Sequence, residues 1–351
     1  MSKTAVILFN LGGPNSQAAV RPFLFNLFYD PAIIRLPNPF RYLLARLITR
    51  LRAEKSRNIY ALIGGASPIY KMTLAQAAAL QEELGGTDNE FRTFVSMRYW
   101  HPFSAEIVRQ VKEYRPDEII LLPLYPQFST TTTGSSLANW AKEAEKQGLV
   151  CTTKSICCYY TESDFIEAHV NLIRAAYADA LKASPGTRPR IIFSAHGLPE
   201  AIIHSGDPYQ FHTEETVKAI MKRLAELGGG AENFDFTLCY QSRVGLMKWL
   251  GPTLEETIKK AAMDAVPVII VPVSFVSEHS ETLTELDIQY KTLAENLNIP
   301  GYHRVPALFL EKNFIKSLAN LVHRAKEQGK GICSYKNRRV CPDEFVGCPN
   351  R

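Results

Sequence analysis

Four short runs of almost unbroken apolar residues predict β-strands that are covered on both faces. They are TAVILFNL (4–11), EIILLPLYP (118–126), RIIFSAH (190–196) and PVIIVPVSF (267–275). Strands buried on both faces are typical of parallel sheets, because helical crossovers cover each side of such a sheet.

Segments with the apolar spacing of helices separate these runs, and the alternation predicts an α/β fold. The helical segments are 73–84, 104–114, 164–183 and 214–227. The pattern is weakly duplicated, with a strand followed by a special turn at NLGGP and PLYPQFS in the first half and at SAHGLP and PVSFVSEH in the second. Two similar α/β domains that face each other across a cleft would place all four turns around one site. We expect domains at 1–160 and 161–330 and a tail at 331–351.

Composition and charge narrow the class of protein. The 351 residues exceed the usual size of one core, and 46% hydrophobic with 21% charged residues is typical of a soluble globular protein. A net charge of +5 is too mild to indicate nucleic-acid binding. The chain begins without a targeting leader and has no apolar run of about 20 residues, so we expect a cytoplasmic protein without a transmembrane segment. Seven cysteines in such a chain argue against a disulfide framework.

The segment 21–52 interrupts the alternation because it mixes bulky apolar residues with six arginines that only Asp30 opposes. A basic amphipathic stretch suits the surface of a membrane. The alternative is a pair of packed helices with a solvated basic face, and the residues alone favour that alternative.

His196 ends a predicted buried strand in IIFSAHGLPE. Ligand sites in open α/β sheets lie at the carboxyl ends of strands, so the position suits a functional histidine. A histidine that only hydrogen-bonds a turn explains the motif equally well.

The stretch SFVSEHSETLTELD (274–287) also follows a predicted buried strand. Read as a helix capped by Ser277, it places Glu278, Glu281 and Glu285 on one face, either solvated or forming a path for a cation. His196 and Glu281 then lie at strand ends of the same domain. An imidazole and a carboxylate together are acceptable ligands for Fe²⁺ and can also act as an acid–base pair.

Three other motifs are ambiguous by themselves. Arg98 in SMRYWHP suits a planar ligand that bears carboxylates, or a cation–π contact in the core. The hydroxyls of PQFSTTTTGSSL precede a helix predicted near Leu137, as an anion site or as N-caps. Trp249, in CYQSRVGLMKWL at a strand end and loop, is either a stacking surface or core.

Together these motifs resemble ferrochelatase, the enzyme family that inserts ferrous iron into a porphyrin in haem synthesis. The resemblance is carried in order by NLGGP, YALIGGASPI, SMRYWHP, YPQFSTTTTGSSL, FSAHGLP, YQSRVG with Trp249, and FVSEHSETLTELD, over nearly the whole chain. It implies two Rossmann-like, chelatase-like domains around a porphyrin cleft. It also implies insertion of Fe²⁺, the substrate metal, into protoporphyrin IX to give protohaem with release of two protons. A coproporphyrin ferrochelatase, a cobalt chelatase of the same fold and a non-catalytic haem-binding protein are the alternatives.

The resemblance also assigns site residues. His196 and Glu281 match the catalytic and metal-binding pair, His279 matches a further catalytic residue, and Glu278 and Glu285 continue an acidic path. Segment 21–52 corresponds to a lip at the site, which reverses our preference there and implies peripheral contact with a membrane. The residues implied to bind the porphyrin are Leu11, Arg52, Tyr60, Arg98, Tyr125, Trp249 and Phe275.

The cysteines of the tail fit a [2Fe–2S] cluster of the kind that some microbial ferrochelatases resembling this chain hold with one internal and three carboxyl-terminal cysteines. The expected ligands are Cys158, Cys333, Cys341 and Cys348, with Cys157 and Cys151 as alternatives to Cys158. Thr130 stands where the animal enzymes have a cluster cysteine. Structural zinc and free thiols are the competing interpretations. The sequence leaves a homodimer open.

Overall fold

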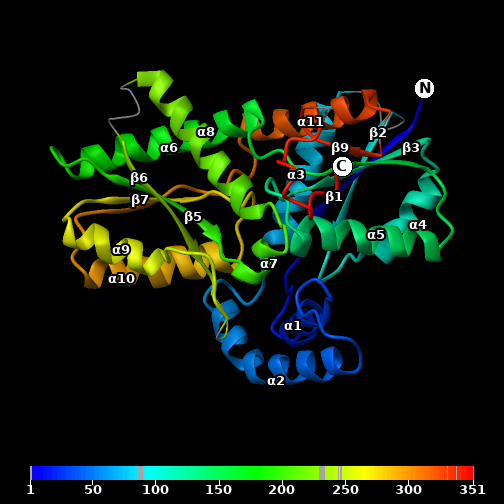
Figure 1. The fold of residues 1–351 in the computed structure, drawn as a ribbon, viewed down its shortest axis with the longest axis horizontal. Helices are drawn as coiled ribbons and strands as arrows, with labels where there is room; N and C mark the ends of the chain where they lie inside the picture. Colours follow the sequence, from blue (N-terminus) through cyan, green and yellow to red (C-terminus); the bar gives the residue numbers. More distant parts are fainter. Residues whose placement is uncertain are drawn as a thin grey trace. The chain divides into compact units, whose positions relative to one another are not determined.

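Two parallel β-sheets, each in its own compact unit, form the framework of the chain (Figure 1). The computed structural model describes residues 2–85, 90–228, 234–243, 245, 247–329, 331–336 and 338–350. Within these ranges the strands are β1 (Thr4–Asn10), β2 (Phe91–Met97), β3 (Glu118–Pro123), β4 (Thr152–Ile156), β5 (Arg190–His196), β6 (Asp235–Gln241), β7 (Val268–Pro272), β8 (Tyr302–Arg304) and β9 (Ile332–Cys333). The predicted α/β class with parallel sheets is confirmed.

Helices occupy most of the chain between the strands. They are α1 (Val20–Tyr29), α2 (Phe40–Ala61), α3 (Ile69–Glu83), α4 (Ser104–Tyr114), α5 (Ser135–Lys146), α6 (Ser163–Ala183), α7 (Glu200–His204), α8 (Tyr209–Gly228), α9 (Leu254–Met263), α10 (Lys291–Asn296) and α11 (Lys312–Glu327), with π-helices η1 (Thr130–Gly134) and η3 (Glu281–Tyr290). The four helical segments predicted from the sequence correspond to α3, α4, α6 and α8.

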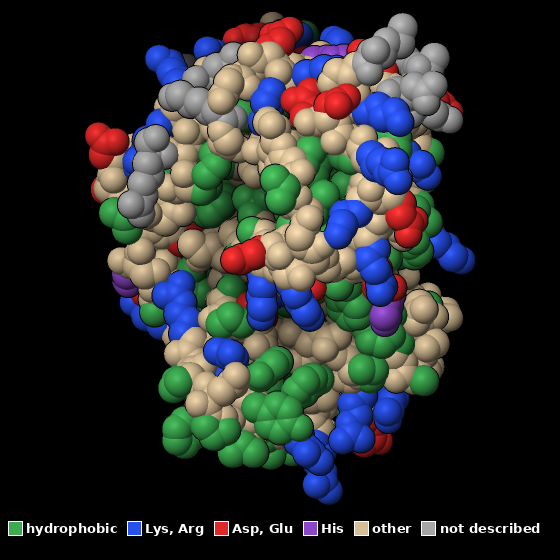
Figure 2. All heavy atoms as spheres, turned by 90° about the vertical axis from the view of Figure 1, so that its right-hand side faces the viewer, with side chains coloured by type: hydrophobic (Ala, Val, Ile, Leu, Met, Phe, Trp, Pro, Cys, Tyr) green, Lys and Arg blue, Asp and Glu red, His purple; other side chains and the backbone are tan. Residues whose placement is uncertain are grey.

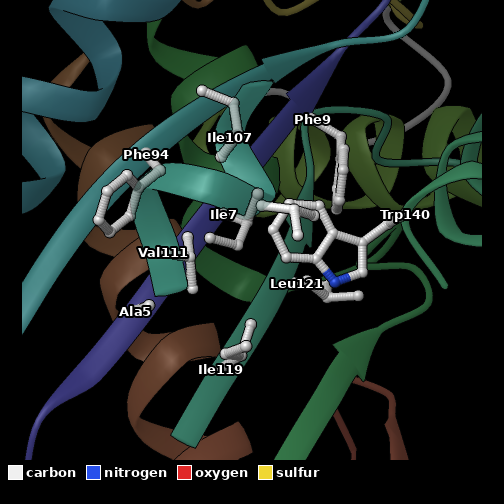
Figure 3. Packing of buried hydrophobic residues seen from close by; sticks show 10 residues of the cluster. Ala5, Ile7, Phe9, Phe94, Ile107, Val111, Ile119, Leu121 and Trp140 are labelled. Carbon is white, nitrogen blue, oxygen red and sulfur yellow. The ribbon is translucent and has the colours of Figure 1, made fainter. Parts of the chain in front are cut away.

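The first sheet has the strand order β2-β1-β3-β4-β9, with all neighbours parallel. All seven residues of β1 are buried, because helices cover both faces of the sheet. On one face, side chains of α4 and α5 pack on β1, β2 and β3 around Trp140, whose ring meets Phe9 edge to face (Figure 3). This core fixes the carboxyl ends of β1, β2 and β3, where Leu11, Arg98 and Tyr125 follow.

The second sheet has the order β6-β5-β7-β8, again all parallel. Apolar residues of β5, β6 and β7 pack with α9, η3 and α10 on one face, and Figure 1 shows α6 and α8 on the other. The register pairs His196 with Gln241, so the ends of β5 and β6 lie side by side. The backbone of His196 and of its neighbour Gln241 is thereby fixed at the carboxyl end of the sheet.

Two compact units divide the chain between Cys158 and Tyr159, two residues from the boundary expected at 160. The division differs from expectation beyond Leu318, because Leu318–Pro342 and Pro349–Arg351 belong to unit 1. The reason is that β9, within the expected tail, adds to the first sheet by pairing with β4. Asp343–Cys348 belongs to unit 2.

The segment 21–52 contributes to two helices, α1 and α2, that pack on each other in unit 1. Their inner sides form a small core around Phe23, Tyr60 and Tyr99. The outer side of α2 leaves Leu43, Leu47 and Leu51 more than half exposed, at the i, i+4 and i+8 positions of one helix face. Figure 2 shows hydrophobic side chains gathered at the lower end of the molecule, where α1 and α2 lie in Figure 1, with basic side chains beside them.

No helix in the described part of the chain is both long enough and apolar enough to span a bilayer.

Candidate active site

The carboxyl end of β5 delivers His196 to the edge of the second sheet. Strand pairing continues to the last residue, and the Gly197 N–H donates to the carbonyl oxygen of Gln241 at 2.9 Å. The His196 side chain is about a third exposed, at 37%. The histidine is therefore anchored by its backbone and open at its ring.

The acidic stretch after β7 folds as a π-helix, and this corrects the predicted geometry. The helix η3 begins at Glu281 with Ser280 as its N-cap, so Ser277 does not cap it. Glu278 precedes the helix and does not share its face. A π-helix repeats its hydrogen bonds at i→i+5, which the α-helical spacing assumed from the sequence does not allow for, and such turns occur frequently at functional sites.

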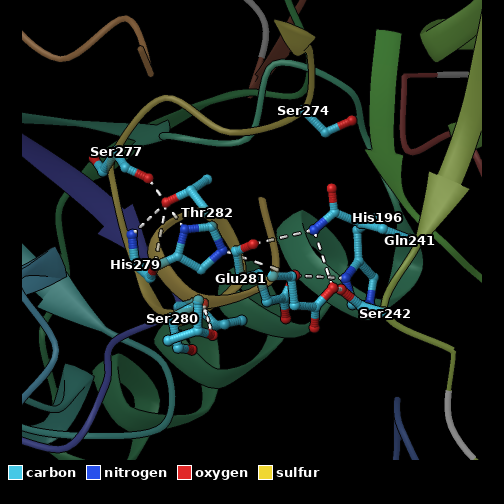
Figure 4. Close-up of polar contacts among 12 residues, drawn as sticks. His196, Gln241, Ser242, Ser274, Ser277, His279, Ser280, Glu281 and Thr282 are labelled. Atoms are coloured by element: carbon cyan, nitrogen blue, oxygen red, sulfur yellow. Dashed lines mark hydrogen bonds and ion pairs between the residues drawn. The ribbon is translucent and has the colours of Figure 1, made fainter. Parts of the chain in front are cut away.

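His196 and Glu281 form a hydrogen-bonded ion pair, with 2.8 Å between Nδ1 and Oε2 (Figure 4). Burial disfavours charge on the imidazole, but the Glu281 carboxylate outweighs burial, so the pKa of His196 lies above its ordinary value. Burial likewise opposes ionisation of Glu281, yet the imidazoles of His196 and His279 hold its pKa well below the ordinary value. The pair thus favours an imidazolium beside a carboxylate.

Glu285 lies one turn further along η3 and is held by two neighbours from the end of β6. The Ser242 hydroxyl donates to Oε2 at 2.7 Å and the Gln241 amide donates to the same oxygen at 3.2 Å. The Ser194 hydroxyl in turn donates to Gln241 Oε1 at 2.5 Å, which orients that amide. Burial, together with the nearby Glu281 charge, raises the pKa of Glu285 to about 7. Glu285 can therefore gain or lose a proton near neutral pH.

This raised pKa predicts that Glu285→Gln stabilises the protein at alkaline pH. The folded state binds the Glu285 proton more tightly than the unfolded chain, so stability is lost as pH rises from the ordinary carboxyl range through about 7. At pH 8 the variant should unfold with a free energy higher by on the order of 2 kcal/mol, and the gain should shrink toward pH 4.5. Urea unfolding at both pH values measures the difference. The exposed control Glu295→Gln should change stability by less than about 0.5 kcal/mol at either pH. A gain for Glu285→Gln that does not depend on pH would contradict the assignment.

Three more predicted residues lie around this pair in unit 2. His279 is buried, with Nε2 3.8 Å from Glu281 Oε2, and the Phe275 ring packs on it at a centroid distance of 4.6 Å. Trp249 pairs with Pro199, three residues after His196, through an isolated antiparallel bridge. In the YQSRVG motif, Val244 lies outside the described residues, as does Leu246 just after it.

Glu278 is not brought to the His196–Glu281 pair. Its Oε1 accepts a hydrogen bond from Arg304 Nη1 at 2.5 Å and another from the Ala307 N–H at 2.9 Å. Despite partial burial, the Arg304 guanidinium holds the pKa of Glu278 below its ordinary value. Arg304 also binds Asp287 through two hydrogen bonds, so Glu278 is part of a structural ion-pair network.

In unit 1, Arg98 at the end of β2 is already paired. Its Nη2 donates to Asp30 Oδ2 at 2.7 Å and its Nε donates to Ser135 Oγ at 2.7 Å. The same Asp30 oxygen also accepts from the Tyr99 hydroxyl at 2.8 Å and from the Ser135 hydroxyl. Nη1 has no partner among the described residues, so only part of the guanidinium is available to a ligand.

The other predicted porphyrin contacts of unit 1 lie near these residues or on helix α2. Leu11 packs with Tyr60 against the core of α1 and α2, and its carbonyl oxygen accepts from the Tyr99 N–H. Arg52 lies over the ring of Phe28 at 5.9 Å. Tyr125 packs against the core of the first sheet, and burial raises the pKa of its hydroxyl.

Several buried cysteines of unit 1 lie close together. Cys157 Sγ is 3.4 Å from Cys158 Sγ, and the Cys158 thiol also interacts with that of Cys341. The Cys157 N–H donates to the carbonyl oxygen of Cys333. Cys151, the other alternative ligand, donates instead to the carbonyl oxygen of Pro116. Cys348 is buried and belongs to the segment of unit 2.

No set of three or more His, Cys, Asp or Glu side chains in the described ranges is arranged to hold a single metal ion. The metal-binding roles of His196 and Glu281 therefore remain predictions. Thiolates are the usual donors of a [2Fe–2S] cluster, and the contacts of Cys158 fit that donor set.

Sequence reasoning missed three residues that take part in the polar contacts around His196 and Arg98. Gln241 lies in a motif that was noted only for Trp249. Asp30 was noted as the lone acid among the arginines of 21–52, and this isolation was the available signal for a buried ion pair. Tyr209 donates its hydroxyl to the carbonyl oxygen of His196 at 3.0 Å. No periodicity marks such a long-range contact.

Known proteins of one family match this chain over nearly its full length. The family model described as Ferrochelatase matches residues 3–326. A ferrochelatase of Wolbachia sp. subsp. Drosophila simulans is 53% identical over 321 residues, covering 91% of this chain and 98% of the relative. A ferrochelatase of Rickettsia bellii is 48% identical over 350 residues, which cover 99% of this chain and 94% of that relative.

Solved structures share the fold at low identity. SirB from Bacillus subtilis with Fe³⁺ aligns with a TM-score of 0.51 and 13% identity over 92% of this chain and 95% of SirB. The sirohydrochlorin chelatase SirB from Bacillus subtilis subspecies spizizenii in complex with cobalt aligns with a TM-score of 0.53 and 11% identity, covering 92% and 96%. The predicted chelatase-like architecture is confirmed.

Proposed function

This chain belongs to the ferrochelatase family, and we propose that it inserts Fe²⁺ into protoporphyrin IX by using His196 as the base that removes the pyrrole protons. As a member of this family it is a lyase of haem biosynthesis, and its substrates are a porphyrin and ferrous iron. The roles of individual residues and the choice of porphyrin are the proposal.

The observation that carries the proposal is the 2.8 Å contact between His196 Nδ1 and Glu281 Oε2. A carboxylate at Nδ1 holds the proton there, so the lone pair of a neutral imidazole lies on Nε2. Nε2 has no hydrogen-bond partner in the described part of the chain, and the ring is partly exposed. His196 is thus oriented to accept a proton from a ligand.

Metallation requires that two N–H protons leave the centre of a planar ring. We assign their removal, one at a time, to Nε2 of His196, which passes the first proton on before it accepts the second, and Glu281 stabilises the imidazolium that forms each time. A ring that binds in a puckered form would direct a pyrrole nitrogen toward the metal, with the distortion offset by contacts elsewhere on the ring. The porphyrin that emerges carries iron, and two protons have passed to the protein.

Glu285 is the next carrier in this proposal. Its pKa of about 7 allows it to take up and release protons at neutral pH, and it lies near Glu281 on η3. We leave Glu278 out of this path, because its Oε1 accepts hydrogen bonds from Arg304 and from the Ala307 N–H. The acidic path is therefore shorter than the one the sequence suggested.

An insertion assay tests the proposed substrate. Purified protein is mixed anaerobically with Fe²⁺ or Co²⁺ and with protoporphyrin or coproporphyrin, and the loss of free porphyrin is followed by absorbance. We expect the highest kcat/KM with Fe²⁺ and protoporphyrin. Faster turnover of coproporphyrin, or of Co²⁺, would contradict the proposed substrate, and haem binding without turnover would indicate a carrier.

We also propose that the porphyrin contacts implied by the sequence serve this substrate. Trp249 and Phe275 offer aromatic surface near His196 and His279 in unit 2. In unit 1 the proposed contacts are Leu11, Arg52, Tyr60, Arg98 and Tyr125.

The exposed leucines of α2 support a proposal of peripheral contact between a cytoplasmic protein and a membrane. Leu43, Leu47 and Leu51 form an apolar stripe, with exposed Arg46 and Arg50 on the same helix. Apolar side chains insert between lipids, and arginines attract anionic headgroups.

This proposal predicts that Leu47→Asp weakens binding to vesicles that contain anionic lipid. Loss of one inserted leucine should reduce the partition coefficient roughly tenfold, measured by co-sedimentation at low salt. Leu181→Asp, at an exposed position on α6, is the control and should bind as the parent does. Equal binding by the parent and Leu47→Asp would contradict the proposal.

We further propose that Cys158, Cys333, Cys341 and Cys348 hold a [2Fe–2S] cluster. The contacts of Cys158 with Cys341, and of Cys157 with the backbone of Cys333, support the three ligands of unit 1. When bound, the cluster would supply an iron–thiolate cross-link among these segments.

A cluster predicts visible absorbance in the purified, iron-replete protein, and Cys348→Ser should abolish it, because one of four thiolates is lost. Cys151→Ser should retain the absorbance, since its thiol bonds to Pro116. A colourless parent that binds zinc would overturn the cluster. Loss of absorbance in Cys151→Ser but not in Cys158→Ser would move the internal ligand to Cys151.

A further inference from the structure

The segment Asp343–Cys348 packs on the turn between α7 and α8 in unit 2, and we propose that this docked segment positions His196 through Tyr209. The inference rests on the proposed role of His196. It assigns a function to a part of the chain that lies beyond residues 3–326, the range matched by the family model.

The contact is a close approach of two backbones at two glycines. The Gly347 N–H donates to the carbonyl oxygen of Gly206 at 3.0 Å. A Cβ on Gly347 would lie 2.9 Å from that same oxygen, and a Cβ on Gly206 would lie 2.5 Å from Val346 Cγ2. Neither position accepts a side chain without a shift of the segment.

An aromatic contact extends the docked surface onto α8. The rings of Phe345 and Phe211 pack with their centroids 5.2 Å apart and an interplanar angle of 31°. The segment closes on itself where the Cys348 N–H donates to the carbonyl oxygen of Phe345 at 3.0 Å. Gly347 thus contacts the turn itself, and Phe345 contacts the first turn of the helix that follows it.

Tyr209 is the first residue of α8, directly after that turn, and connects the turn to β5. Its backbone N–H donates to Asp207 Oδ1 at 3.0 Å, which ties it to the residue after Gly206. Its hydroxyl donates to the carbonyl oxygen of His196 at 3.0 Å and lies 3.1 Å from Ser274 Oγ. The Tyr209 side chain is buried.

The consequence is a continuous chain of contacts from the docked segment to the base. Gly347 and Phe345 hold the turn, the turn holds Tyr209, and Tyr209 holds the backbone of His196. A small displacement of a catalytic group lowers kcat strongly, because proton transfer requires a hydrogen-bond distance between donor and acceptor. Tyr209 is therefore a positioning residue, and the docked segment sets its place.

Gly347→Ala tests the first link, because the added methyl group meets the oxygen of Gly206. We expect kcat for iron insertion to fall about tenfold with KM for the porphyrin unchanged. The matched control is Gly329→Ala, whose Cβ would have no neighbour within 4 Å, and it should behave as the parent. An unchanged kcat in Gly347→Ala, or a change confined to KM, would overturn the proposal.

A double-mutant cycle tests the second link. Tyr209→Phe removes only the hydroxyl and should lower kcat by a similar factor. If the docked segment acts through Tyr209, the double variant should be no slower than the slower single variant. Multiplied effects in the double variant would show that the two act independently and would overturn the proposal.

Two further variants distinguish the docking model from an effect of Cys348 and from failure of the proposed base. Phe345→Ala loosens the same contact three residues from Cys348 and should also lower kcat. A lower kcat in Gly347→Ala with an unchanged kcat in Phe345→Ala would mean that the substitution acts through the neighbouring Cys348. That result would overturn the docking model. Failure of the proposed base is distinguishable, because His196→Ala would then turn over normally in the same assay. Circular dichroism establishes that each variant is folded.

Discussion

Replacing His196 with alanine is expected to lower kcat for iron insertion by roughly a hundredfold to ten-thousandfold, the range that a positioned general base contributes. The variant loses the imidazole whose Nδ1 is hydrogen-bonded to the Glu281 carboxylate and whose Nε2 is left to accept a proton. Porphyrin affinity should change little, because the proposed ring contacts are other side chains. Anaerobic insertion kinetics give kcat, and the absorbance shift on porphyrin binding gives Kd.

The pH profile gives the same assignment a second readout. Because the Glu281 charge raises the pKa of His196, activity should increase as pH rises through a value above the ordinary histidine range. Glu281→Gln removes that charge and should shift the rise to lower pH. His204→Ala, on the exposed side of α7, is the control and should match the parent. Normal turnover by His196→Ala would eliminate it as the base.

Replacing Asp30 with alanine is expected to lower the free energy of unfolding by about 3 to 5 kcal/mol, as when one partner of a buried ion pair is removed. The Asp30 side chain is only 2% exposed, and that of Arg98 is 18% exposed. One carboxylate oxygen accepts from Arg98, Tyr99 and Ser135, so the variant leaves three donors without their acceptor. Denaturant unfolding measures the loss.

A paired substitution distinguishes the ion pair from simple packing. Asp30→Leu combined with Arg98→Met replaces both charges by apolar groups and should be less destabilised than Asp30→Ala, because no charge is left unpaired. The exposed control Glu344→Ala should lie within about 0.5 kcal/mol of the parent. A loss below 1 kcal/mol for Asp30→Ala would contradict the described network.

The sequence predicted those elements whose burial is uniform. The strands β1, β3, β5 and β7 occupy interior positions in their sheets, and every residue of β1 and β7 is buried for that reason. The edge strands β2 and β6 carry polar residues such as Arg92 and Asp235 and escaped the pattern. The strand β9 has two residues and depends on pairing with β4, which local sequence cannot reveal.

The sequence predicted those site residues that lie at or after the end of a buried strand. His196 and Glu281 each follow a recognisable buried strand, and the sheet brings them together. The placement of Glu278 on one helix face with Glu281 and Glu285 was wrong, because α-helical spacing was assumed, and its contact with Arg304 carries no local signal. Arg98 was read as a contact for a substrate carboxylate, and its motif gave no sign that Asp30 also pairs with it. Long-range charge pairing was the information that the motifs lacked.

The two sheets repeat one strand order, with the first strand of each unit flanked by its second and third. His196 ends β5, the first strand of the second unit, and Asn10 ends β1, the first strand of the first unit. Asn10 is buried, its amide donates to Thr73 and its oxygen accepts from the Leu11 N–H. A side-chain amide neither gains nor loses a proton near neutral pH, so it cannot act as an acid or a base. The two units therefore share a strand order, but the first strand of one ends on an ionisable side chain and that of the other does not, so fold symmetry alone would direct mutagenesis to a residue that cannot act as an acid or base.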